Sequence, residues 1–296
     1  MILSQDLRNL VDQLEAESAR LTPSQLRERI EILDRLDALF GDRNAPVFQI
    51  EPEHAAALPR AEALRAQLEA LNVDLYRSIR TEIQCGTEPE LLLQLAQESV
   101  ASQTPAGGLS FDYLDELLSG VLALEEPDPP PAHPPDGMVF YQPTPARHIF
   151  RLLNLTVLTQ ADVLVDLGSG LGHVPLLAAI CTGARCVGIE REEAYVSLAR
   201  RCAQQLNLDR ASFLQQDARQ ADLSRGTAFY LYTPFTGAIL FDVLSKLQHE
   251  SKSHPIRICT FGPCTEAIAK EPWLESDGQP DPDHITIFST RRSVSA

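Results

Sequence analysis

Residues 163–172 read Val-Leu-Val-Asp-Leu-Gly-Ser-Gly-Leu-Gly and place three glycines directly after a short apolar run. An apolar run of this length predicts a buried strand. The glycines Gly168, Gly170 and Gly172 predict a tight turn in which the backbone lies bare. In α/β proteins, a strand that leads through such a turn into a helix brings a ligand against the backbone at the carboxyl end of the strand. The stretch therefore predicts the fold class and the place of a ligand.

The chain on both sides of this stretch alternates between short apolar segments and amphipathic ones. The expected strands are residues 163–165, 186–189, 211–214, 228–232 and 256–261. The expected helices between them are residues 175–181, 193–205 and 238–247. Two further segments, 273–275 and 285–289, could close the sheet as an antiparallel pair. Such alternation predicts an α/β fold with a parallel sheet and helices on both faces.

The spacing of the glycines bears on which ligand the turn takes. A dinucleotide-binding turn has the pattern GxGxxG, whereas this turn reads GxGxG and has His173 where the third glycine would stand. Asp166, two residues before the first glycine, would repel a pyrophosphate but suits the ammonium group of a methionine moiety. The turn therefore favours S-adenosylmethionine over NAD, and an NAD-dependent oxidoreductase is the least favoured function.

Two more acids follow the next two expected strands. Glu190 ends the second strand, where a carboxylate can accept hydrogen bonds from both ribose hydroxyls. Asp217 ends the third strand, where a carboxylate can accept a hydrogen bond from the adenine amino group. A single acid at a strand end is more often a solvated loop residue. Three acids in order on successive strands favour a nucleoside site.

With these motifs in place, the chain resembles the class I S-adenosylmethionine-dependent methyltransferases over about residues 139–290. The matching motifs are DLGSGLG (166–172), VGIE (187–190), FLQQDA (213–218) and FYLYTPF (229–235). The resemblance implies a Rossmann-like domain with a seven-stranded sheet, the last strand antiparallel. It also implies a cofactor site formed by Asp166, Gly168, Ser169, Gly170, Gly172, Glu190, Asp217 and Ala218.

The segment FYQPTP (140–145) is similar to the cofactor-covering loop of non-SET histone-lysine methyltransferases and of small protein-lysine methyltransferases. This resemblance implies that Tyr141 and Thr144 contact the cofactor. The alternative is that Tyr141 packs under the linker that precedes it.

Tyr232, Thr233, Pro234 and Phe235 occupy the place of the Asn/Asp-Pro-Pro-Tyr/Phe segment of amino-group methyltransferases and are the expected catalytic residues. The resemblance implies backbone carbonyls that hold an amine and an aromatic wall at Phe235. Here Tyr232 replaces the Asn or Asp, and only Pro234-Phe235 keeps the family pattern. Tyr232, Tyr141 and His173 are the candidates for handling a proton.

The part of the chain before residue 137 has a different character. Leucines at three- and four-residue spacing predict helices, and nearly all of the net charge of −16 falls on this part. A proline-rich segment then interrupts any regular structure. We expect an acidic helical domain at 1–124, a Pro-rich linker at 125–137 and an S-adenosylmethionine-binding domain at 138–296. The acidity favours a basic protein partner over nucleic acid. The alternative is that the negative surface only keeps the protein soluble.

The remaining expectations concern location and partners. Asp6, Asp12 and Glu15 interrupt any apolar core of a secretory signal, and no apolar run is long enough for a membrane span. We expect a cytoplasmic protein with reduced cysteines, no metal site and no membrane partner. The expected function is methyl transfer to an amino group, including that of a protein lysine. A small-molecule acceptor and a non-catalytic S-adenosylmethionine-binding protein are the alternatives, and the oligomeric state is left open.

Overall fold

The computed structural model describes residues 4–40, 57–101, 112–125, 127, 137–139 and 141–291. The chain divides into two units, Met1–Ile79 and Arg80–Ala296. Among the described residues, none of the helices has the length and apolar character needed to cross a membrane.

The first unit contains helix α1 (Ser4–Ser18), helix α2 (Leu26–Phe40) and most of helix α3 (Ala57–Gln84). Their apolar stripes meet in a core that includes Val11, Leu14, Ile32, Leu36, Leu64 and Leu68. Arg29 is buried beside this core, where its Nε donates to Asn72 (2.7 Å) and its Nη1 donates to the carbonyls of Thr22 and Pro23. The expected helical character of the N-terminal part is confirmed.

Two more helices precede the sheet, α4 (Glu90–Ala101) and α5 (Tyr113–Leu122), and both lie in the second unit. Asp115 of α5 accepts a hydrogen bond from the backbone N–H of Ala146 (2.8 Å), which is the first residue of α6 (Ala146–Thr156). The contacts thus divide the chain at residues 79 and 80, whereas the sequence places a boundary at 124. The expected linker at 125–137 lies outside the described residues except for 125, 127 and 137, and it stays a prediction.

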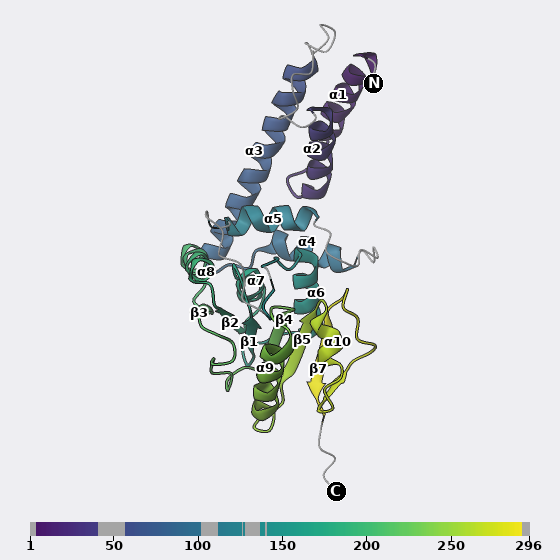
Figure 1. Cartoon of the computed structure of the whole chain (residues 1–296). Coiled ribbons are helices and arrows are strands. Elements are labelled where there is room, and N and C mark those ends of the chain that lie inside the picture. Colours follow the sequence, from purple (N-terminus) through teal and green to yellow (C-terminus); the bar gives the residue numbers. More distant parts are fainter. Residues whose placement is uncertain are drawn as a thin grey trace. The chain divides into compact units, whose positions relative to one another are not determined.

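The sheet of the second unit has seven strands in the order β3-β2-β1-β4-β5-β7-β6. Figure 1 shows the part of this order from β3 to β7. The strands are β1 (Val163–Leu167), β2 (Arg185–Glu190), β3 (Ala211–Gln215), β4 (Ala228–Tyr232), β5 (Arg257–Phe261), β6 (Leu274–Ser276) and β7 (Thr286–Thr290). The first five are parallel, and β7 runs antiparallel to both β5 and β6. The Rossmann-like sheet and its antiparallel closing pair are therefore confirmed.

The helices that follow the strands are α7 (His173–Cys181), α8 (Glu193–Gln205), α9 (Gly237–Glu250) and α10 (Cys264–Ile268). Helix α7 begins two residues earlier than expected, and neither α6 nor α10 was expected. The central strands are apolar on both faces, since Leu164, Val165 and Leu167 of β1 are all buried. Burial of a large apolar side chain stabilises the fold by about 1.5–3 kcal/mol, so these strands carry much of the core.

The strand order also positions a ligand site. From β1 the chain adds β2 and β3 on one side and then returns to add β4 and β5 on the other. The helices after β1 and β4 therefore leave the sheet in opposite directions. Such a reversal opens a crevice at the carboxyl ends of the two strands.

Candidate active site

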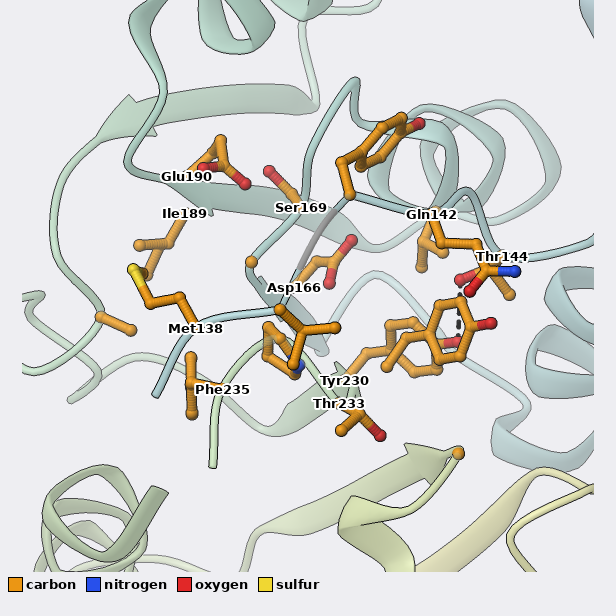
Figure 2. A pocket seen from close by; sticks show the side chains of 18 of the residues that line it. Met138, Gln142, Thr144, Asp166, Ser169, Ile189, Glu190, Tyr230, Thr233 and Phe235 are labelled. Atoms are coloured by element: carbon orange, nitrogen blue, oxygen red, sulfur yellow. Dashed lines mark hydrogen bonds between the residues drawn. The ribbon is translucent and has the colours of Figure 1, made fainter. Parts of the chain in front are cut away.

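A cavity of about 700 Å³ lies at the carboxyl ends of the strands β1, β2, β4 and β5. This volume falls within the range of about 300–1,000 Å³ that is usual for small-molecule sites. Figure 2 shows side chains from the covering segment (residues 137–145), the β1 turn, β2 and the end of β4 around the same space. The predicted site residues that line it are Tyr141, Thr144, Asp166, Gly168, Ser169, Glu190, Asp217, Ala218, Tyr232, Thr233, Pro234 and Phe235.

Gly170 and Gly172 belong to the turn but are not among the lining residues. Gly170 has a φ of +51°, and a Cβ there would come within 2.1 Å of the Tyr141 ring. Gly172 precedes α7 and packs beneath Phe213. The ring of Tyr141 and the core thus take the space over these two glycines, which leaves Gly168 as the one that faces the cavity. At Gly168 the φ is +85° and a Cβ would lie 2.3 Å from Pro234.

Asp166 and Ser169 are buried polar residues at the start of the turn. Asp166 is 4% exposed, and burial together with the negative charge of Glu190 raises the pKa of its carboxyl well above the ordinary value. The Oγ atom of Ser169 is buried and has no hydrogen-bond partner in the structure. Figure 2 shows both side chains in the wall of the cavity. An unpaired buried hydroxyl is costly, and a hydrogen-bonding ligand would satisfy Ser169 Oγ. An ammonium group on that ligand would stabilise the charged form of the Asp166 carboxyl.

Glu190 is fixed by the backbone of its own neighbourhood. Its Oε1 accepts hydrogen bonds from the N–H groups of Arg191 (2.6 Å) and Glu192 (2.9 Å), and its Oε2 accepts one from Gly170 (2.9 Å). Three such bonds hold the carboxylate rigidly at the end of β2 and leave acceptor capacity on Oε2, which accepts only one of them. The glycine-rich turn and β2 are thereby tied together.

Asp217 follows β3 and pairs with Arg219 in a two-pronged salt bridge whose shortest distance is 2.6 Å. The guanidinium lowers the pKa of the Asp217 carboxyl. The salt bridge is partly exposed, so its contribution to stability is small. The neighbouring Ala218 is buried and lines the cavity.

The covering segment (residues 137–145) is attached to the end of β4. Met138 and Phe235 form an antiparallel bridge, and the N–H of Val139 donates to the carbonyl of Pro234 (3.2 Å). Farther along, the hydroxyl groups of Thr144 and Tyr230 are hydrogen-bonded at 3.0 Å. One piece of chain thus contacts both the β1 turn and the end of β4. Tyr141 forms part of the cavity wall, and the linker ahead of it lies outside the described residues.

Thr233 adopts an unusual backbone conformation just after β4, with a φ of +40°. A β-branched residue in this region is strained. Its hydroxyl holds the conformation, because Oγ1 accepts a hydrogen bond from the N–H of Cys264 (3.0 Å) and donates to the carbonyl of Phe261 (3.2 Å). The segment predicted to be catalytic is therefore clamped to the turn between β5 and α10.

The far end of the cavity is aromatic and acidic. The rings of Tyr232 and Phe261 lie 4.8 Å apart, and Pro282 and Asp283 of the loop between β6 and β7 complete the wall. Across the whole cavity, the described lining residues include five acids and one arginine: Asp166, Glu190, Glu192, Asp217, Asp283 and Arg191.

His173 also lines the cavity. Burial lowers the pKa of His173 to about 4, so its imidazole is neutral at pH 7.

Several lining residues escaped sequence reasoning, among them Tyr195, Tyr230, Phe261 and Asp283. Phe261 ends the predicted strand 256–261, so its position at the carboxyl edge was available from the sequence. The position of Asp283 could not be predicted from the sequence, because it depends on the conformation of the β6–β7 loop. In that loop the carbonyl of Pro282 accepts a hydrogen bond from the N–H of Gly262 in the β5–α10 turn (2.8 Å). No group of three His, Cys, Asp or Glu residues with metal-ligand geometry occurs in the described ranges.

Comparison with known proteins finds matches to the second half of the chain. Residues 158–246 match a family model described as a methyltransferase domain. No curated protein matches the sequence. Among solved structures, an RNA methyltransferase from Salinibacter ruber in complex with S-adenosyl-L-homocysteine is 30% identical and covers 50% of this chain and 92% of that one, with a TM-score of 0.39.

Two further structures are each similar over more than half of the chain. A precorrin-6y C5,15-methyltransferase from Geobacter metallireducens is 15% identical over 53% of this chain and 94% of that one, with a TM-score of 0.41. The human methyltransferase 10 domain containing protein is 15% identical over 59% and 92%, with a TM-score of 0.40. The expected similarity to protein-lysine methyltransferases finds no support in these comparisons.

Proposed function

We propose that this chain, an S-adenosylmethionine-dependent methyltransferase, transfers the methyl group to an amino nitrogen of a positively charged acceptor. The lining of the far end of the cavity carries the proposal: it consists of the aromatic side chains of Tyr232 and Phe261 with Asp283 beside them, and no lysine or arginine is among its described residues. Aromatic faces and carboxylates attract a cationic amine.

The proposal assigns the opposite end of the cavity to the cofactor. Asp166 would hold the ammonium group of the methionine moiety, and Ser169, whose Oγ is buried without a partner, would hydrogen-bond to the same moiety. Glu190 would accept hydrogen bonds from the ribose hydroxyls, and Asp217 with Ala218 would meet the adenine. Gly168, Gly170 and Gly172 shape the turn, while Tyr141 and Thr144 would cover the cofactor from the other side.

The methyl group on the sulfonium of S-adenosylmethionine is already activated for in-line displacement by a nitrogen lone pair. The task of the chain is therefore to align that nitrogen and to exclude water from it. Tyr232 and Phe261 would flank the amine, and Phe235, which is buried at the base of the cavity, would hold the end of β4 in place. The clamped Thr233 and the Pro234 beside it would fix the backbone that faces the nitrogen.

The proton of the acceptor amine needs a destination. Burial raises the pKa of Tyr232, so its hydroxyl stays protonated at neutral pH and does not serve as a general base. His173 points to Tyr141 and hydrogen-bonds to its hydroxyl. We therefore assign no general base: the acceptor ammonium gives its proton to water, and the amine then reacts in its neutral form.

An acceptor that binds through phosphates would require cations, because phosphate contacts dominate the affinity for nucleic acids. The cavity offers five acids and one arginine among its described lining residues. The charge of the cavity therefore favours an amine over a nucleic acid. Both a lysine side chain and a small polyamine satisfy this chemistry.

The test is transfer of a radiolabelled methyl group from S-adenosylmethionine to three acceptors offered separately: a lysine-rich peptide, a polyamine and total RNA. We expect label in an amine acceptor. Tyr232→Leu removes the aromatic wall and should lower the transfer rate about ten-fold, whereas the matched control Tyr232→Phe keeps the ring and the rate. Label in the RNA alone, or equal rates in the two variants, would contradict the proposal.

A further inference from the structure

The ring of Tyr141 is held on two sides. On one side it lies against Gly170, where a side chain would collide with the ring at 2.1 Å. On the other side it packs against the ring of Tyr195 on α8, with centroids 4.9 Å apart. The tyrosine thus reaches from the covering segment (residues 137–145) across the glycine-rich turn.

The hydroxyl of Tyr141 is hydrogen-bonded to a residue beyond the turn. It lies 3.1 Å from Nδ1 of His173, which is the first residue of α7. The imidazole is neutral at pH 7, because burial lowers its pKa to about 4. The two side chains therefore form a neutral hydrogen bond between the covering segment and the helix that follows the turn.

The other attachments of the covering segment lie at its two ends. Val139 is hydrogen-bonded to Pro234, and Thr144 is hydrogen-bonded to Tyr230. Both partners belong to β4 or to the turn after it. Between these ends, the Tyr141–His173 hydrogen bond joins the covering segment to the β1–α7 unit.

We infer that His173 is a positioning residue that holds Tyr141 across the glycine-rich turn and thereby slows the release of S-adenosylmethionine. The covering segment forms one wall of the cavity, and Tyr141 lies in that wall. Opening this wall requires the hydrogen bond to break. The inference rests on the cofactor alone and is independent of the acceptor proposed above.

The test measures the dissociation rate of S-adenosylmethionine by stopped-flow fluorescence for four variants. Tyr141→Phe and His173→Leu each remove the hydrogen bond and should each speed dissociation about three- to ten-fold, the range expected for one hydrogen bond. The double variant should dissociate no faster than either single one, because only one bond is lost. His173→Asn should restore a rate near that of the unchanged chain, since its amide group lies where Nδ1 lies and can donate or accept.

His249→Leu serves as the matched control, because His249 is exposed near the end of α9. Thermal unfolding without cofactor separates a structural defect from faster release. A structural role alone would lower the melting temperature and leave the dissociation rate unchanged. Unchanged dissociation in Tyr141→Phe, or effects of the two single changes that add in the double variant, would overturn the inference.

Discussion

At the scale of a single residue, the protonation of Asp166 is coupled to the binding of a ligand. Its carboxyl is buried in the cavity wall, and its pKa is raised by burial and by Glu190. Because a cationic ligand stabilises the carboxylate form, binding of an ammonium group must lower that pKa again. Ligand binding and proton release are therefore coupled at this residue.

This coupling predicts how the affinity for S-adenosylmethionine depends on pH. With the pKa of Asp166 raised in the free protein, a larger share of the carboxyl is protonated at low pH and must lose its proton before binding. The affinity should therefore rise with pH through the free-state pKa and level off above it. Titrations from about pH 5 to pH 8 check the slope, and Asp166→Asn should bind weakly at every pH. An affinity that falls as the pH rises would contradict the sign.

Gly170 supports a second prediction at this scale. In Gly170→Ala the new Cβ would meet the Tyr141 ring at 2.1 Å, so the ring must move and cofactor binding should weaken at least about ten-fold. Gly86→Ala is the matched control, because Gly86 also has a positive φ (+70°) but no atom within 4 Å of the added Cβ. Both changes carry the backbone cost of about 1–2 kcal/mol. Equal cofactor affinity in the two variants would show that the contact with Tyr141 has no role.

At the scale of elements, the end of β4 is held by a side-chain clamp. Thr233 Oγ1 bonds to the N–H of Cys264 and to the carbonyl of Phe261, and so joins β4 to the β5–α10 turn. The same bonds hold Thr233 at its positive φ. The hydroxyl of Thr233 therefore fixes the backbone conformation at the end of β4.

Thr233→Val keeps the shape of the side chain but leaves the Cys264 N–H unpaired in a buried place. We predict a loss of about 1–3 kcal/mol in the free energy of unfolding, measured by urea denaturation. Thr233→Ser keeps the hydroxyl and should lose much less. A valine variant as stable as the serine variant would show that the clamp contributes nothing.

The sequence predicts those strands and helices of the second unit that have a recognisable pattern of apolar residues within the element itself. The parallel strands were predicted because each is a short apolar run between turn residues. Helix α6 was not expected, although Ile149, Phe150, Leu152 and Leu153 lie buried on it at helical spacing just after Pro145. Helix α10 has five residues, which is too short for any periodicity to show.

At the scale of the whole molecule, the predicted cofactor end of the cavity came from three acids and three glycines whose order along the chain matches the order of strands. The far end could not be predicted in this way. Its wall brings together Tyr232 at the end of β4, Phe261 at the end of β5 and Asp283 of the β6–β7 loop. Which segments meet there depends on the β5-β7-β6 order and on the hydrogen bond between Gly262 and Pro282, which no local pattern encodes.

The charge of the molecule supports a further prediction. The chain has a net charge of −16, and the described lining of the cavity is predominantly acidic. A cationic acceptor is therefore attracted during its approach, and salt should weaken this attraction. Raising the ionic strength from about 0.02 M to about 0.3 M should increase the KM for a lysine-rich peptide several-fold and leave kcat nearly unchanged. A KM that falls with added salt would argue against an acceptor of this charge.

Calorimetric titration with S-adenosylmethionine, run beside NAD and repeated with Asp166→Asn, tests directly whether the cavity binds this cofactor. We predict micromolar binding of S-adenosylmethionine, which corresponds to about −8 kcal/mol, together with no binding of NAD and a large loss of affinity in the variant. Equal binding of S-adenosylmethionine by the variant and the unchanged chain would contradict the claim that the cavity beside Asp166 is the cofactor site.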